Sequence, residues 1–407
     1  MARSTVRIGS QRRRYPGGVR AEVGDGAPDR GPAPRREEVP VSAAVPPGFS
    51  PGLEGVVAFR TEIAEPDRDG GALRYRGVDI EDLVGSVGFG DVFGLLVDGG
   101  LGRPLPREEP GLEPPFSGDV RVDAQAGLAL LGARWTLPPL LDATPERARD
   151  DLARGAAAAL ALVARSARGA ELPTVPATVL DPIDDPVERF LVRWRGEADP
   201  THVRALDAYW VSAAEHGLNA STFTARVVAS TGADAAAALS AAVGAMSGPL
   251  HGGAPARVLP MIAEVERTGD AEAVVRGILD RSERLMGFGH RVYRAEDPRA
   301  RVLRRVARDL GAPRYEAAAA LEAAALAALR ERRPDRAIET NVEFWAAVML
   351  DLAGVPAPMM PAMFTCARTA GWAAHVLEQR RTGRLVRPSA QYIGPGPRAV
   401  ETVARTA

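Results

Sequence analysis

The chain has 407 residues, 46% of them hydrophobic, which is enough for one large core or two ordinary ones. Its 51 basic and 52 acidic residues leave a formal net charge of -1, so no overall field favours nucleic acid or an anionic membrane. The sequence contains no lysine, which excludes Schiff-base aldolases, pyridoxal-phosphate enzymes and Walker-type phosphate loops, because each of these needs one.

The single cysteine, Cys366, has no partner for an intramolecular disulfide and cannot form a cysteine cluster for a metal. This usage fits a reducing cytoplasm, which is the compartment we expect. No apolar run approaches the roughly 18 residues that a membrane span needs, and the N-terminus lacks an apolar signal segment. We therefore expect no membrane association.

The N-terminal part of the chain predicts an arm followed by a small hairpin. Residues 1–48 are rich in Pro, Gly and Arg with almost no apolar periodicity, so we expect them to be disordered. Residues 56–65 alternate as a short strand does, and residues 73–80 predict its return after an Asp-Gly-Gly turn. The Pro-rich residues 104–115 predict a loop.

Beyond the hairpin, the pattern predicts an all-α protein. Apolar residues recur at three-to-four spacing and are interrupted by Pro and Gly, which is typical of amphipathic helices. The predicted helices span residues 123–131, 145–166, 186–196, 202–215, 233–246, 254–267, 270–286, 298–310, 315–331, 342–353 and 361–381.

Three of the five histidines lie beside glycines. These are His216, His251 and His290, which we expect on loops or helix ends where the backbone can approach a ligand closely. His202 begins a predicted helix and His375 belongs to a helix face, so both are expected to be structural. A single histidine is more often structural than catalytic, so a functional interpretation depends on the set.

Three arginines complete this set. Arg299, Arg368 and Arg387 lie close to Gly or Pro and outside any run of charges. An arginine binds a carboxylate through two parallel hydrogen bonds, so together they predict a site for a small dicarboxylate. The plainer interpretation of each one alone is a solvated surface side chain.

Residue types alone also allow a metal site. Its ligands would be His216, His251, His290 and Glu343. The chain offers no close i, i+4 pair on which such a site could be built, so we expect no metal.

The sequence resembles the citrate synthase family over about residues 51–398. The entry segment LRYRGVDIEDLV (73–84) is similar to the start of that family. Six ordered blocks follow: HGLNASTFTARVVAST (216–231), GPLHGGAPARVL (248–259), MGFGHRVYRAEDPRARVL (286–303), NVEFWAAVML (341–350), CARTAGWAAHVLEQ (366–379) and RLVRPSAQYIGP (384–395). The resemblance implies an almost all-α two-domain fold, with a large domain from residues 51–254 and 350–398 and a small domain from residues 255–349 that closes on it.

The resemblance also implies roles for the chemical groups. His251 would hydrogen-bond the thioester oxygen of acetyl-CoA, His290 would polarise the keto oxygen of oxaloacetate, and Glu343 would remove the methyl proton. Coenzyme A enters as a substrate, and no cofactor is implied. Contacts to oxaloacetate and citrate would come from His216, Arg299, Arg368 and Arg387, the last contributed across a homodimer interface. Apart from the resemblance, Arg291 and Arg294 flank His290, so we expect them either to contact the coenzyme A phosphates or to be ordinary surface arginines on a turn.

Glu343 departs from the family pattern, which most often has aspartate at this position. The extra methylene moves the carboxylate by about one bond length, and a misplacement of about 1 Å can cost roughly a hundredfold in rate. Because every other site residue is present, we expect the backbone to compensate.

Three activities remain open on the sequence alone. Besides citrate synthase, a 2-methylcitrate synthase using propionyl-CoA needs room for only one more methyl group, a difference of about 1–3 kcal/mol. The third is a catalytically weak paralogue that binds oxaloacetate or coenzyme A. The intact His251 and His290 speak against it.

Overall fold

The computed structural model describes residues 48–67, 69, 71–248, 251, 255–289, 293 and 295–400. It divides into two units, Val57–Pro388 and a smaller unit formed by Met1–Val56 with Ser389–Ala407. In the described part of the smaller unit, the regular structure is one 3-10 helix, η1, at Pro51–Leu53. The predicted arm at residues 1–48 lies outside the described residues except for its last position.

The larger unit begins with a three-stranded antiparallel sheet in the order β1-β2-β3. The strands are β1 (Ala64–Asp67), β2 (Ala72–Tyr75) and β3 (Val78–Asp79). β1 and β2 flank the Asp-Gly-Gly turn, with Ala64 opposite Tyr75 and Asp67 opposite Ala72. The predicted hairpin is therefore confirmed.

The first strand starts at Ala64, so the prediction of a strand from residue 56 was wrong at its beginning. Val57 is 87% exposed, so the first alternating residues do not cover a core, whereas Ile63, directly before β1, is fully buried. The backbone N–H of Glu62 donates to the carboxylate of Glu378 at 2.9 Å instead of to a neighbouring strand. A side chain from the far end of the chain thus holds this segment.

The remainder of the larger unit is helical, as the sequence predicted. Asp, Asn or Thr side chains cap many of the helices by accepting from a free N–H of the first turn. The helices are α1 (Ile80–Leu83), α2 (Phe89–Asp98), α3 (Val120–Arg134), α4 (Pro145–Arg168), α5 (Ala177–Leu180), α6 (Pro186–Arg195), α7 (Pro200–Ala213), α8 (Ala220–Ser230), α9 (Ala235–Met246), η2 (Pro255–Arg257), α10 (Leu259–Thr268), α11 (Ala271–Asp280), α12 (Pro298–Asp309), α13 (Tyr315–Arg332), α14 (Val342–Leu352), η3 (Ala357–Met359) and α15 (Met360–Thr382).

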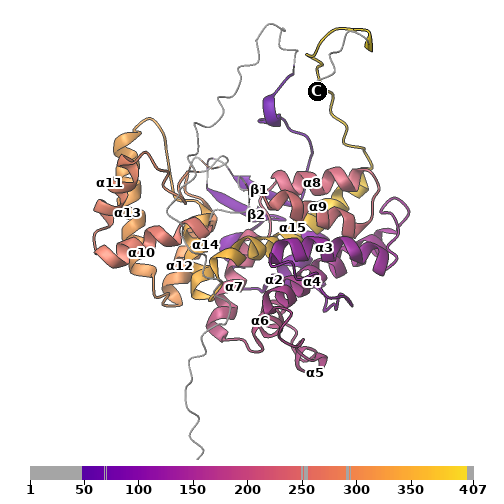
Figure 1. The fold of residues 1–407 in the computed structure, drawn as a ribbon, viewed down its shortest axis with the longest axis horizontal. Coiled ribbons are helices and arrows are strands. Elements are labelled where there is room, and N and C mark those ends of the chain that lie inside the picture. Colours follow the sequence, from indigo (N-terminus) through magenta and orange to yellow (C-terminus); the bar gives the residue numbers. More distant parts are fainter. Residues whose placement is uncertain are drawn as a thin grey trace, which may run out of the picture. The chain divides into compact units, whose positions relative to one another are not determined.

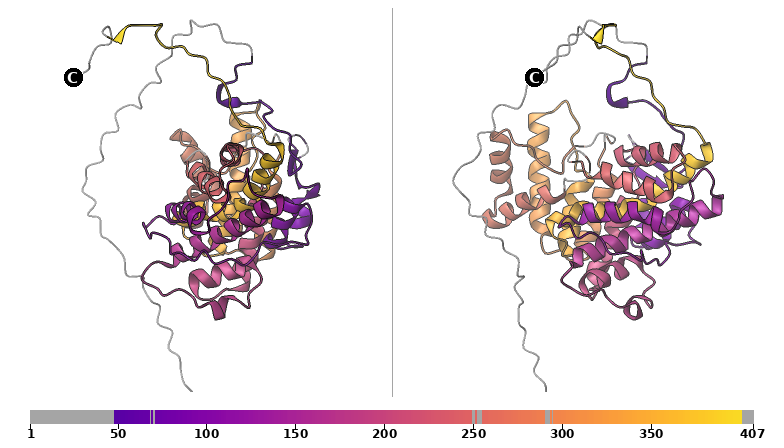
Figure 2. Two further views of the ribbon diagram at one scale, coloured as in Figure 1. Left: turned by 90° about the vertical axis from the view of Figure 1, so that its right-hand side faces the viewer. Right: turned by 45° about the vertical axis from the view of Figure 1, so that its right-hand side comes forward.

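α15 is the central helix of the larger unit. It packs against α2, α3, α4, α7, α8 and α9, and Figure 2 shows it running through the middle of these helices. Trp372 and Cys366 on this helix are fully buried, and burial raises the pKa of the Cys366 thiol. None of the helices in the described part of the chain has the length and apolar character required to cross a membrane.

A second group of helices stands to one side of α15. α10, α11 and α13 pack against one another, and both figures show them apart from α3 to α6 (Figure 1, Figure 2). α12 and α14 pack together and both contact α7. α7 therefore connects the helices around α15 to the pair α12 and α14.

Gly371 marks the closest approach of α15 to the connection between α7 and α8. A Cβ atom at this position would lie 2.1 Å from Oε2 of Glu215 and 2.6 Å from the carbonyl oxygen of Ala214. Because one of these atoms belongs to the backbone, a larger side chain cannot be accommodated by a simple rotation. Glycine is thus required here for packing.

We expect Gly371→Ala to lower the free energy of unfolding by about 1–3 kcal/mol or more, as overpacking a core does. Urea unfolding followed by circular dichroism measures this change. Gly277→Ala is the matched control, because the nearest atom to its added Cβ is the end of the flexible Arg281 side chain at 3.4 Å. In the interior of α11, that change should stabilise by roughly 0.5–1 kcal/mol. Equal effects of the two substitutions would contradict the packing role of Gly371.

Candidate functional site

A small cavity lies where α7, α12, α14 and α15 meet. The space between its walls, part of which is open to solvent, is about 260 Å³. Its walls are formed by Tyr209, Ala213, Pro255, Arg299, Val342, Glu343, Ala346 and Phe364. The cavity thus combines one carboxylate and one guanidinium with mostly apolar walls, which is the usual composition of a site for a small organic ligand.

Glu343 is the carboxylate of this cavity. It is the second residue of α14, and its backbone N–H donates to the Asn341 side chain at 3.0 Å, which fixes the start of the helix. The side chain is half-buried. Burial raises the pKa of Glu343 to about 7, although the nearby Arg299 and Arg284 favour the charged form. Near neutral pH, Glu343 can therefore both accept and release a proton.

Arg299 is held rigidly by the carboxylate of Asp297. Its Nε and Nη2 donate to the two oxygens of Asp297 at 2.9 and 2.7 Å, in a buried bidentate pair. Burial opposes the charge, but Asp297 holds the pKa of Arg299 above its usual value. Asp297 also caps α12 and accepts from the backbone N–H of Val342 at 3.1 Å. The same carboxylate thus fixes both Arg299 and the start of α14.

Arg368 is a buried guanidinium that lacks a carboxylate partner. It is 1% exposed, and its Nε donates to the carbonyl oxygen of Ala213 at 2.8 Å. Its guanidinium carbon lies 4.7 Å from the ring centre of Phe364, a wall of the cavity. Among the described residues, no Asp or Glu lies within ion-pair distance of Arg368. Burial lowers its pKa. A buried cation without a counter-ion is costly, so the site favours an anionic ligand.

His251 also lies against Phe364, with the two ring centres 6.1 Å apart. Its Nε2 is 2.9 Å from Oγ of Ser221 and 3.4 Å from the backbone N of the same residue. A backbone N–H can only donate, so Nε2 is the acceptor and the imidazole proton is on Nδ1. Burial and the charge of Arg368 lower the pKa of His251 to about 4. His251 is therefore a neutral hydrogen-bond donor at neutral pH.

Helix α15 fixes the partner of His251. Nε1 of Trp372 donates to Oγ of Ser221 at 3.1 Å, in a fully buried contact. Ser221 is in the first turn of α8, where free N–H groups point out of the helix. The orientation of His251 thus depends on one residue of α8 and one of α15.

His216 reaches the cavity through a tyrosine. Its Nε2 is 3.0 Å from the hydroxyl of Tyr293, and the two rings pack edge to face with centres 5.3 Å apart. Burial raises the pKa of Tyr293, while the charge of Arg299 acts in the opposite direction. His216, Tyr293 and Arg299 therefore lie in the same region.

The structure brings four of the predicted site residues together around the cavity. Glu343 and Arg299 line it, and Arg368 and His251 contact its Phe364 wall. The other predicted site residues do not line this cavity in the described part of the chain. His290, Arg291 and Arg294 lie outside the described residues. Arg387 is exposed on the segment after α15 and does not line the cavity.

The other two histidines lie away from this cavity. His202, near the start of α7, has its Nδ1 3.1 Å from Nη1 of Arg195. His375 is 1% exposed within α15.

Several residues of the site were not found from the sequence. Ser221, Tyr293 and Asp297 belong to the blocks HGLNASTF, GFGHRVY and DPR, so their positions beside His216, His290 and Arg299 were the only available signal. Phe364 and Trp372 have ordinary helical spacing and gave no signal. Among the described residues, no three His, Cys, Asp or Glu side chains gather closely enough to hold a metal ion.

The family relationship follows from comparisons with known proteins. A model of the family described as "Citrate synthase, C-terminal domain" matches residues 52–109 and 123–389. This chain therefore belongs to the citrate synthase family. A Mycobacterium tuberculosis protein named "Putative citrate synthase 2" is 71% identical over 360 residues, which cover 88% of this chain and 96% of the relative.

A more distant relative and a solved structure add detail. A Shewanella oneidensis protein named 2-methylcitrate synthase is 30% identical over 383 residues, covering 87% of this chain and 97% of the relative. Citrate synthase from Thermoplasma acidophilum, solved as a ternary complex with carboxymethyl coenzyme A and oxaloacetate, superposes with a TM-score of 0.73 at 27% identity. That comparison covers 86% of this chain and 97% of the other. The fold is thus that of solved citrate synthases.

Proposed function

We propose that this protein condenses acetyl-CoA with oxaloacetate to give citrate and coenzyme A. The proposal is carried by one observation: the cavity is lined by a carboxylate with a pKa of about 7, and its Phe364 wall contacts Arg368, a buried guanidinium that has no carboxylate partner among the described residues. The first group suits proton removal near neutral pH, and the second suits a substrate carboxylate. Family membership supports the same reaction class.

The first step would be formation of the enol. The Glu343 carboxylate takes a proton from the thioester methyl group, and the electron pair of that C–H bond moves toward the thioester oxygen. His251 donates from Nδ1 to this oxygen and stabilises the charge that develops there. A neutral donor is suited to this role, because its pKa of about 4 keeps it from being an imidazolium at working pH.

The second step would join the two substrates. The enol carbon attacks the keto carbon of oxaloacetate, a C–C bond forms, and the keto oxygen takes a proton, for which the family resemblance proposes His290. Water then hydrolyses the thioester, which releases citrate and coenzyme A. The carboxylates of oxaloacetate would be held by His216, Arg299 and Arg368, with Arg387 reaching them from the partner subunit of a homodimer.

The remaining parts of the proposal follow the family. Arg291 and Arg294 would contact the coenzyme A phosphates, and residues 255–349 would close as a small domain over the remainder of the helical fold. The reaction requires neither a metal nor a redox cofactor, because the base removes the methyl proton and the hydrogen-bond donors stabilise the charge that develops on the substrate oxygens. We propose a cytoplasmic homodimer as the working form.

Turnover with two thioesters tests the proposal. Release of the free thiol of coenzyme A is followed in the presence of oxaloacetate, with acetyl-CoA or propionyl-CoA as the second substrate. Higher kcat/KM with acetyl-CoA supports the proposal. Higher kcat/KM with propionyl-CoA identifies a 2-methylcitrate synthase, to which the relative from Shewanella oneidensis points. Absence of turnover with either contradicts the proposal and favours a binding paralogue.

We further expect Glu343→Asp to lower kcat by roughly a hundredfold, because the shorter side chain withdraws the carboxylate from a position to which the cavity is adapted. The same thiol assay measures this. Glu316→Asp, at an exposed position of α13, is the matched control and should leave kcat unchanged. An increase in kcat with Glu343→Asp would show instead that the glutamate impairs the enzyme.

A further inference from the structure

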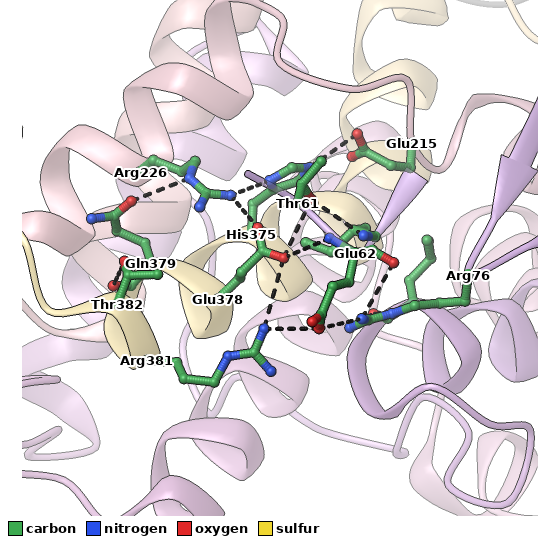
Figure 3. Close-up of polar contacts among 12 residues, drawn as sticks. Thr61, Glu62, Arg76, Glu215, Arg226, His375, Glu378, Gln379, Arg381 and Thr382 are labelled. Atoms are coloured by element: carbon green, nitrogen blue, oxygen red, sulfur yellow. Dashed lines mark hydrogen bonds and ion pairs between the residues drawn. The ribbon is translucent and has the colours of Figure 1, made fainter. Parts of the chain in front are cut away.

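A chain of polar side chains, most of them buried, is linked by hydrogen bonds and ion pairs within the larger unit (Figure 3). It joins the connection between α7 and α8 to α8 itself and to the C-terminal half of α15. Its members are 0 to 5% exposed: Glu215, Arg226, His375, Glu378 and Gln379. Two carboxylates and a guanidinium in such surroundings are costly unless each has a defined partner. The proposed reaction uses none of them.

The imidazole of His375 connects Arg226 to Glu215. Nη1 of Arg226 lies 2.6 Å from Nδ1 of His375, and a guanidinium can only donate, so Nδ1 is the acceptor. The proton of the imidazole is therefore on Nε2, which donates to Oε1 of Glu215 at 3.1 Å. The direction of both hydrogen bonds is fixed by Arg226.

Arg226 has a counter-ion of its own. The same Nη1 donates to Oε2 of Glu378 at 2.7 Å, and Nε donates to Oε1 of Gln379 at 3.2 Å. The charge of Arg226 is thus balanced by Glu378. Glu215 is not needed to neutralise Arg226, and its negative charge acts on other groups.

The next cation along the same side of α15 is Arg368. Oε2 of Glu215 lies against the backbone of α15 at Gly371, three residues or about one turn from Arg368. Among the described residues, this oxygen has no hydrogen-bond partner. Burial acts against the charge of Glu215, but His375 and Arg368 hold its pKa below the usual value. Glu215 and Arg368 therefore attract each other without forming an ion pair.

The backbone of Glu215 is also held close to the site. The hydroxyl of Tyr75 contacts both its N–H at 3.2 Å and its carbonyl oxygen at 3.1 Å. Glu215 directly precedes His216, and Arg368 donates to Ala213 two residues earlier. The direction of the Glu215 side chain thus depends on His375 and on the backbone N–H of His216, which also hydrogen-bonds its carboxylate.

We propose that His375, oriented by Arg226, is a positioning residue that holds the Glu215 carboxylate away from Arg368 and keeps this guanidinium available to a carboxylate of the substrate. Without the hydrogen bond from His375, the carboxylate rotates toward Arg368 and occupies it. The inference rests on the proposed function, since it names the device that sets the affinity of that site for oxaloacetate.

The test compares oxaloacetate binding to the full-length protein by isothermal titration calorimetry. His375→Phe removes the donor, and we expect the Kd for oxaloacetate to rise about tenfold or more, because a hydrogen bond to a buried charge is lost. His375→Gln places an amide donor near the position of Nε2, and its Kd should stay within about threefold of wild type. The KM for acetyl-CoA should not change in either variant.

A second pair of variants separates this mechanism from a loss of packing. Glu215→Gln removes the competing charge, so it should leave the Kd unchanged or lower it, and in combination with His375→Phe it should restore the Kd to within about threefold of wild type. If His375→Phe folds poorly, the Kd values of Glu215→Gln and of the double variant still test whether the Glu215 charge competes for Arg368. His202→Phe is the matched control, because it removes another histidine that contacts an arginine, far from Glu215.

Three results would overturn the inference: an unchanged Kd in folded His375→Phe, equal increases in His375→Phe and His375→Gln, or no restoration by Glu215→Gln. If the wild-type protein nevertheless turns over oxaloacetate, these results for the variants leave the proposed function standing. A wild-type protein that neither binds nor turns over oxaloacetate overturns both.

Discussion

Glu343→Gln should lower kcat with acetyl-CoA by about 10²–10⁴-fold, the usual contribution of a positioned general base. The amide keeps the shape of the side chain but cannot accept the methyl proton. The KM for oxaloacetate should change little, because Arg299 is bound to Asp297 and Arg368 to Ala213, independently of Glu343. Steady-state kinetics by release of the coenzyme A thiol measures both constants.

The pH dependence of the wild-type enzyme is a second test of Glu343 as the base. The base must be ionised, and the pKa of Glu343 is about 7, so kcat/KM should fall about tenfold per pH unit below about 7. His251, with a pKa of about 4, adds no limb between pH 5 and 8. A profile that stays flat from pH 8 to 5 would contradict the assignment of Glu343 as the base.

Stability measurements provide the control for Glu343→Gln. The pKa of Glu343 is higher in the folded protein than its usual value of 4.5, so its stabilising contribution is present below about 4.5 and is lost as pH rises through about 7. At pH 8, glutamine removes an unfavourable buried charge, and the variant should be at least as stable as wild type. That relative advantage should disappear toward pH 4.5. Glu316→Gln on the exposed face of α13 should change neither kcat nor Tm.

His251→Ala should lower kcat by about 10²–10³-fold, comparable to the removal of one oxyanion donor. The reason is that Nδ1 is the only hydrogen-bond donor of an imidazole whose Nε2 accepts from the Ser221 N–H. His251→Asn should recover part of this loss, since its amide nitrogen occupies a position similar to Nδ1. His251→Gln places its amide nearer to Nε2 and should remain as impaired as His251→Ala.

The order of these three variants distinguishes donation from packing. Asparagine more active than glutamine and alanine indicates donation from Nδ1. Equal loss in all three would indicate that the ring acts only through its contact with Phe364. His202→Ala, on the outer part of α7, should retain the kcat of wild type.

Many helix positions could be predicted from the sequence, because capping residues and apolar spacing within each segment agree with the tertiary structure. The predicted helix at residues 145–166 becomes Pro145–Arg168, between a Thr144 cap and Gly169, and residues 298–310 become Pro298–Asp309 after an Asp297 cap. Both helices carry an apolar face and a capping side chain, which are properties that neighbouring residues determine.

The observed helices differ from the predicted ones where contacts with distant parts of the chain determine the structure. The predicted helix at residues 270–286 ends at Asp280, because Gly287 must approach Phe344 on α14, where an added Cβ would lie 2.8 Å from Cβ of Phe344. Helices α2 and α8 were not predicted. Glycines occur within α2, and α8 has a polar first turn, and both features are unfavourable in a helix interior or give no apolar signal there.

The sequence predicted which residues form the candidate site but not how they are arranged in space. Glu343, His251, Arg299 and Arg368 were all named from their motifs. Their sequence numbers do not show that His251 and Arg368 both contact Phe364, one wall of the cavity. The bond between Asp297 and Val342 likewise joins residues 45 positions apart. Such contacts depend on the packing of complete helices.

The burial of α15 has a consequence for the evolution of this enzyme. Seventeen of its 23 residues are buried, and they include Arg368, which contacts the Phe364 wall of the cavity, and Trp372, which donates to Ser221. A substitution there perturbs the hydrophobic core and the chemistry at once, so few changes are tolerated singly. Drift in this chain should instead accumulate on helices such as α13, where only four of 18 residues are buried. Among the cavity walls outside α15 and apart from Glu343, Val342 alone is only partly buried, so a new substrate preference would arise there with the least disturbance of the core.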